Sequence, residues 1–155
     1  MDDTILNNVL NNVYTAWGIG SYLTRELIIS YAKETYPLLV ERAKAGKPIY
    51  YGELPVFWKI QHFYGVVPKV IGMIVGICSQ YDLDRGLHAI SAIVVNQNHD
   101  EPGDGFYGLS HTPISLSSAT WEKQGRTPTP EIRKQREEFW HREYDAVIAD
   151  NKIKR

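Results

Sequence analysis

The sequence predicts a helix-rich α+β single domain with a winged-helix-like centre and a small β-sheet. Three observations support this prediction. Apolar residues recur at helical spacing near both ends of the chain, and a β-branched run lies in the middle. The length of 155 residues, with 43% hydrophobic and 23% charged residues, is typical of one globular domain. We expect N-terminal helices over 1–46, a winged-helix-like core over 49–107 and a C-terminal helix over 129–150.

The N-terminal region is expected to form three helices. Ser21 is placed to cap the second, and Pro37 is expected to break it. A third helix would then begin at Thr35 and end near Ala45. The first helix is predicted by a stripe of apolar residues at three- and four-residue spacing: Leu6, Val9, Leu10, Val13 and Trp17.

The central segment is expected to alternate extended pieces with helices. Ile49 and Tyr50 would be extended, and helices would cover 52–63 and 68–80. The β-branched run over 89–95 predicts a buried strand, and Phe106-Tyr107 is expected to add a short strand to the sheet. Between them, 98–105 is rich in glycine, aspartate and proline, which predicts a turn.

The last helix is predicted by its cap and by its charge pattern. Thr129 is placed to cap it and a proline follows in the first helical position. On its polar face, Arg133 with Glu137 and Lys134 with Glu138 have the i,i+4 spacing of helical ion pairs.

The composition excludes several classes of protein. A net charge of −1 argues against a general nucleic-acid coat protein, although it leaves room for a local basic face. The only cysteine, Cys78, excludes an internal disulfide and a multi-cysteine zinc site. The acidic N-terminus lacks the pattern of a signal peptide, and the apolar stretches are too short to span a membrane. We expect a cytoplasmic protein without membrane contact and without a cofactor.

Three short motifs carry the functional hint. They are Tyr51-Gly52-Glu53-Leu54, then Pro68-Lys69-Val70-Ile71-Gly72, and finally Ser91-Ala92-Ile93-Val94-Val95-Asn96 before a glycine turn. Together they resemble the DNA-binding domain of the alkylguanine–DNA alkyltransferases and alkyltransferase-like proteins. The resemblance covers a little over a third of the chain. It implies a winged-helix fold that binds double-stranded DNA.

The resemblance assigns roles to individual residues. Tyr51 would contact the backbone near a flipped nucleotide, and Lys69 takes the place of the family's intercalating arginine. Ser91 aligns with the alkyl-accepting cysteine if the Val-Val pair is kept in register, and Ala92 does so after a shift of one residue. Because neither residue is a thiol, we expect no alkyl transfer. Asn96 and Asn98, in the turn, would face the nucleic acid. The first hypothesis is therefore a non-enzymatic DNA-binding protein that recognises backbone, shape or a modified base, with a base pocket beside Ser91.

Two other hypotheses belong to different classes. Near-neutral charge and abundant aromatic residues favour a small protein-binding regulator or inhibitor of a nucleic-acid enzyme. A metal-dependent nuclease or hydrolase would use His99, Asp100, Glu101 and Asp104, although a polar turn explains these residues equally well. The second central helix also leaves two interpretations open, because Gly72 and Gly76 would allow close approach either to DNA or to another helix.

Overall fold

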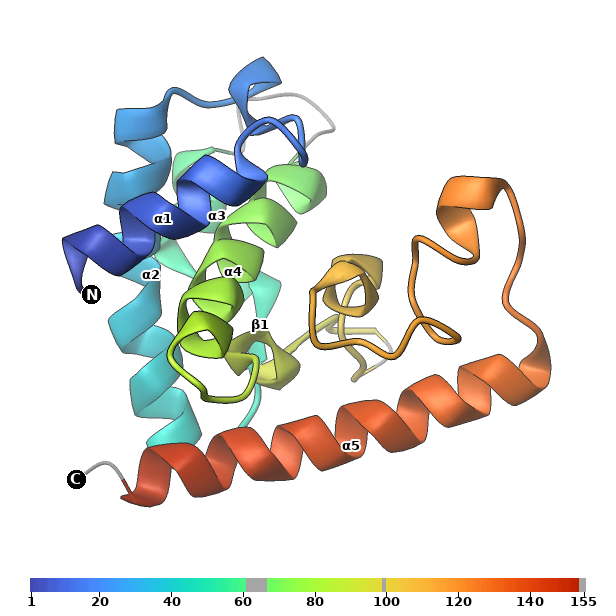
Figure 1. The fold of residues 1–155 in the computed structure, drawn as a ribbon. Coiled ribbons are helices and arrows are strands. Elements are labelled where there is room, and N and C mark those ends of the chain that lie inside the picture. The colour runs from blue at the N-terminus through green and yellow to red at the C-terminus, as the bar shows by residue number, and fades with distance from the viewer. Residues whose placement is uncertain (61–66, 99, 154–155) are drawn as a thin grey trace.

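The computed structural model describes residues 1–60, 67–98 and 100–153. Helices α1 (Asp3–Val13), α2 (Arg25–Lys44) and α4 (Val67–Asp84) pack together, and the long helix α5 (Pro130–Ile153) lies across one side of this bundle (Figure 1). A short helix, α3 (Pro55–Lys59), lies near α2 and α4. The prediction of a helix-rich α+β domain with a small sheet is confirmed.

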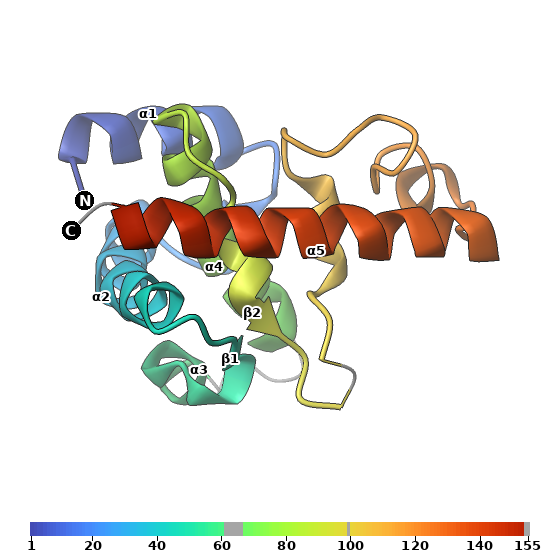
Figure 2. The same ribbon diagram turned by 90° about the horizontal axis from the view of Figure 1, so that it is seen from below.

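The sheet consists of two very short parallel strands. Strand β1 (Ile49–Tyr50) pairs with β2 (Val94–Val95), with Ile49 opposite Val94 and Tyr50 opposite Val95 (Figure 2). A wing would be an antiparallel hairpin, and the described residues contain none. The winged-helix comparison therefore does not extend to the strand pairing.

The expected strand over 89–95 is wrong in most of its length. Residues Ile90–Ile93 form the 3-10 helix η3, and only the next two residues are extended. Phe106 and Tyr107 also lie in a 3-10 helix, η4 (Asp104–Gly108), rather than in a strand. A short apolar run can be buried either as a strand or as a tight helical turn. Over so few residues, hydrophobic periodicity does not distinguish a strand from a helical turn.

Helix α4 runs through the core. Its apolar residues are buried on all sides, against α1, α2, η3 and η4. Gly76 allows the approach of Trp17, because a Cβ at that position would lie 3.1 Å from the indole ring. For Gly76, the structure favours the helix-packing interpretation. Cys78 is buried in the same helix, and burial raises the pKa of its thiol, so it is a core residue rather than a nucleophile.

Two expectations about the N-terminal helices are corrected. Helix α2 is continuous through Pro37. Proline has no backbone N–H, so the carbonyl four residues earlier loses its hydrogen-bond donor, and because Pro37 is exposed, water can replace that donor. Its N-cap is Thr24, whose hydroxyl accepts a hydrogen bond from the Leu27 N–H at 3.2 Å, and not Ser21. Ser21 instead ends the 3-10 helix η1 (Ile19–Ser21).

The expectations for the C-terminal helix are confirmed at its start. The Thr129 hydroxyl accepts a hydrogen bond from the Ile132 N–H at 3.2 Å, and Pro130 is the first helical residue. The segment from 109 to 129, which includes the 3-10 helix η5 (Glu122–Gln124), packs against the first half of α5. In the part of the chain that the structure describes, no helix is long and apolar enough to cross a membrane.

Candidate nucleic-acid interface

Ser91 is enclosed in the core and cannot meet a base. Its side chain is 4% exposed, its hydroxyl is 2.6 Å from the Ser79 hydroxyl, and its N–H donates to the same oxygen at 2.7 Å. This pair joins η3 to α4 and satisfies both buried hydroxyls. A base pocket beside Ser91 was expected only if that position were open, and the structure buries it.

Lys69 is exposed, but most of the helix that carries it is packed against other elements. Its ammonium lies 5.4 Å from the centre of the Tyr22 ring, in the first turn of α4. From Val70 onward the helix is buried by its neighbours. A helix must present a free face to enter the major groove, and neighbouring elements cover most of α4 after its first turn. Lys69 instead lines a mainly apolar groove with Gly72, Gly105 and other residues.

Tyr51 and the predicted turn do lie together. Tyr51 is half-buried in the 3-10 helix η2 (Tyr51–Glu53), and its hydroxyl is so close to Gly103 that a Cβ there would lie 2.9 Å away. The backbone of Asn96 closes the turn, since its N–H donates to the Glu101 carbonyl at 2.8 Å and its carbonyl accepts from the Asp100 N–H at 2.9 Å. Asn98 is exposed at the tip.

The acidic turn does not assemble a metal site from its described residues. The Asp100 carboxylate accepts a hydrogen bond from the Tyr50 hydroxyl at 3.0 Å, whereas Glu101 lines a different cavity. No three His, Cys, Asp or Glu side chains among the described residues are grouped so that they could hold an ion. His99 and the side chain of Asp104 lie outside the described part.

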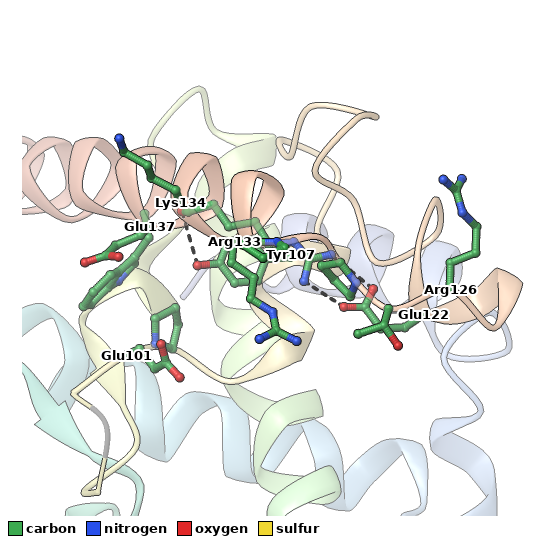
Figure 3. Close-up of a pocket in the computed structure, with 13 residues that line it drawn as sticks. Glu101, Tyr107, Glu122, Arg126, Arg133, Lys134 and Glu137 are labelled. Carbon is green, nitrogen blue, oxygen red and sulfur yellow. Dashed lines mark hydrogen bonds and ion pairs between the residues drawn. The ribbon is translucent and has the colours of Figure 1, made fainter.

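One large cavity lies where α5 begins, and we call it the α5 cleft. It has a volume of about 720 Å³ and is bounded by α5, by the turn at 101–102 and by residues 122–130 (Figure 3). The turn that the sequence predicted to face nucleic acid thus forms one wall of it. Its charged and aromatic lining comprises Glu101, Tyr107, Glu122, Arg126, Arg133, Lys134, Arg136, Glu137 and Trp140.

A buried arginine forms the fixed part of the α5 cleft. Arg136 is only 6% exposed, and its guanidinium donates to both carboxylate oxygens of Glu122, at 2.7 and 3.1 Å. Its Nε donates to the Leu116 carbonyl at 2.8 Å, and the guanidinium lies 4.8 Å from the centre of the Tyr107 ring. The hydrogen bonds from Arg136 lower the pKa of Glu122, so the pair stays ionised at neutral pH.

Three further cations line the cleft without a carboxylate partner. Arg126, Arg133 and Lys134 form no ion pair with any described residue, and Arg126 only stacks over Trp121 at 4.4 Å. In Figure 3 the Arg133 guanidinium points into the open space between Glu101 and Glu122, whereas Arg126 and Lys134 point outward. The expected i,i+4 pairs to the glutamates at 137 and 138 do not form, so these charges remain available.

Sequence reasoning missed Arg136, although the pattern contained a signal. Arg136 lies four residues after Ile132 and three before Phe139, which places it on the apolar stripe of α5. A charged residue that is buried on such a stripe needs a partner of opposite charge, and here the partly exposed Glu122 provides it.

No family model matches the chain, and neither does any curated protein or solved structure. The resemblance to the alkyltransferase-like domain therefore rests on the three sequence motifs alone.

Proposed function

We propose that this protein is a non-enzymatic nucleic-acid-binding protein that holds the sugar–phosphate backbone in the α5 cleft. The observation that carries the proposal is a group of three cations without a carboxylate partner among the described residues, around an arginine already fixed in place. Arg133 points into the cleft, and Arg126 and Lys134 line it but point outward (Figure 3). Phosphate oxygens accept hydrogen bonds from such side chains without regard to sequence.

The position of these cations adds to their effect. Arg133 and Lys134 lie in the first turns of a 24-residue helix, whose N-terminal N–H groups carry partial positive charge. Arginine also presents a planar fork of donors that suits a phosphate. Because Glu101 and Glu137 share the cleft, the net positive charge is small, and we expect weak binding that depends strongly on salt.

The proposal moves the contact surface predicted from the sequence. The start of α4, with Lys69, is replaced by α5, whereas the turn after Asn96 is kept because Glu101 and Pro102 form a wall of the cleft. In this proposal the protein binds through contacts to the backbone and the shape of the nucleic acid. It does not place a recognition helix in the major groove.

Fluorescence anisotropy of labelled duplex and single-stranded DNA tests the proposal, at about 50 and 200 mM salt. The double variant Arg133→Ala/Lys134→Ala should bind about tenfold more weakly or worse. The slope of log affinity against log salt concentration should become shallower by roughly the amount expected for two lost phosphate contacts. Lys69→Ala is the matched control and should bind as the parent does. Unchanged binding by the double variant, or loss confined to Lys69→Ala, would contradict the proposal.

A protein partner is the second candidate, favoured by two exposed apolar side chains. Trp58 is 58% exposed and Ile114 is 77% exposed, so a partner could cover both side chains. Such a complex would persist at high salt, because burial of apolar surface does not weaken as phosphate binding does. A partner that is retained at high salt and lost in Trp58→Ala or Ile114→Ala would favour this alternative.

A further inference from the structure

A second cavity lies beside the α5 cleft and has different chemistry. It has a volume of about 460 Å³, ample for one nucleobase, and we call it the aromatic pocket. Three half-buried aromatic side chains line it, Tyr50 from β1 and Trp140 and Tyr144 from α5. Two carboxylates, Asp100 and Asp145, complete the polar part of the lining.

The aromatic walls are held in place before any ligand arrives. The Trp140 indole N–H donates to the Ala92 carbonyl at 2.8 Å, and the Trp140 and Tyr144 ring centres are 6.3 Å apart at 81°. The Tyr50 hydroxyl donates to Asp100 at 3.0 Å. Aromatic side chains fixed in this way can stack on a base with little loss of conformational freedom.

The two carboxylates have accepting capacity to spare. Neither Asp100 nor Asp145 pairs with a cation among the described residues. His141 also lines the pocket, and its Nε2 lies 3.9 Å from a Glu137 oxygen. Ionised carboxylates accept hydrogen bonds and donate none, so a ligand must offer N–H groups to them.

The aromatic pocket and the α5 cleft share a wall. Trp140 lines both, and the consecutive residues Asp100 and Glu101 each line one of them. One cavity therefore presents unpaired cations, and its neighbour presents aromatic rings with carboxylates. A nucleotide has the complementary arrangement, with an anionic phosphate at one end and a base at the other, and the carboxylates would repel a phosphate from the aromatic pocket.

We propose that the aromatic pocket takes an unpaired nucleobase that carries an exocyclic amino group, while the adjoining phosphate lies in the α5 cleft. Cytosine and adenine offer that amino group to a carboxylate, whereas uracil and thymine present a carbonyl oxygen in its place. The inference rests on the proposed function and adds a base preference that backbone contact alone does not produce.

The test compares labelled single-stranded oligo-dC and oligo-dU of equal length, about ten nucleotides, at fixed salt, against the full chain. The two bases have the same size, so stacking is matched and the amino group is the main variable. We expect oligo-dC to bind about tenfold more tightly, in line with one good carboxylate–amino contact. Equal affinities for the two oligomers would overturn the base proposal and leave the proposed function standing. No binding of either would overturn both.

Carboxamide variants make the test specific to the aromatic pocket. Asp145→Asn and Asp100→Asn should reduce the preference for oligo-dC severalfold, because a carboxamide can also donate to the uracil oxygen. Asp84→Asn, in an exposed aspartate at the end of α4, is the control and should keep the preference. Thermal unfolding of each variant confirms that it folds. Displacement of oligo-dC by tetramethylammonium chloride, but not by sodium chloride of equal concentration, would overturn the proposal in favour of an organic-cation site.

Discussion

Helices α4 and α5 are both long, but they differ in how much of their surface is buried. Helix α4 carries buried apolar residues around most of its circumference and is packed by neighbours along its length. Helix α5 buries only a stripe that includes Phe139 and Val147 and leaves its other face to water. The difference shows that a helix enclosed by other elements organises the core, whereas a helix with one free face can build a site.

The comparison also explains why the start of α4 resembles a recognition helix although neighbours cover most of that helix. The start of α4 has a lysine and glycines in a motif that resembles a recognition helix, but a short motif does not report what packs around it. The start of α5 has no such motif, and its cations belong to an ordinary amphipathic pattern. That face is distinctive because Arg126, Arg133 and Lys134 have no carboxylate partner among the described residues.

The largest expected effect is on the core that α4 organises. Ile74→Ala removes a fully buried side chain and should lower the free energy of unfolding by about 2–5 kcal/mol. Ile148→Ala, at a half-buried position of α5, should have a clearly smaller effect. Urea denaturation of both variants measures the difference, and equal losses would mean that the two helices contribute alike.

A smaller effect concerns the pH dependence of the contact between α5 and the segment after η4. His111 lies among Phe106 and Phe139, with its Nε2 3.4 Å from a Glu143 oxygen, and burial lowers the pKa of His111 to about 4. The unfolded chain takes up this proton near pH 6.5, before the folded protein does. Stability contributed by His111 is therefore lost as pH falls from about 6.5 towards 4.

His111→Phe removes that loss. Thermal unfolding at pH 7 and pH 5 should show a smaller decrease in Tm for the variant than for the parent. Burial raises the pKa of Glu143, which has the opposite effect on the pH dependence, but Glu143 is present in both proteins and its contribution largely cancels. An identical decrease in both proteins would show that His111 takes up its proton equally readily in the folded state.

The next prediction compares two arginines of α5. Arg136→Met removes the paired guanidinium from Glu122, which is itself about a third exposed, and should destabilise the protein by about 1–3 kcal/mol. Arg133→Met is the same substitution at an exposed, unpaired position, and should change stability by no more than about 0.5 kcal/mol. Chemical denaturation of the two variants decides whether only the buried arginine is structural.

The smallest effect separates the two glycines of α4. Gly72→Ala meets nothing within 4 Å and should stabilise the helix by up to about 1 kcal/mol. At Gly76 the new methyl group would lie 3.1 Å from Trp17, so the gain should be absent or reversed. Differential scanning calorimetry of both variants measures this, and equal stabilisation would mean that Trp17 moves aside freely.

The sequence alone determined the class of fold and several helix ends. Regular apolar spacing predicted α1 and α5, and Thr129 with Pro130 located the start of α5, because capping depends on neighbours in the chain. The burial of Cys78 also followed from its apolar surroundings in sequence. The continuity of α2 through Pro37 did not, since it depends on the rest of that helix being held by tertiary contacts.

The tertiary structure decided what each surface can contact. It enclosed Ser91, covered most of α4 after its first turn, and placed Glu122 against Arg136, which lies 14 residues away. It also brought Asp100 of the turn next to Trp140 and Asp145 of α5. These outcomes depend on contacts between residues distant in the chain, and local spacing carries no information about which distant side chain will occupy a given space.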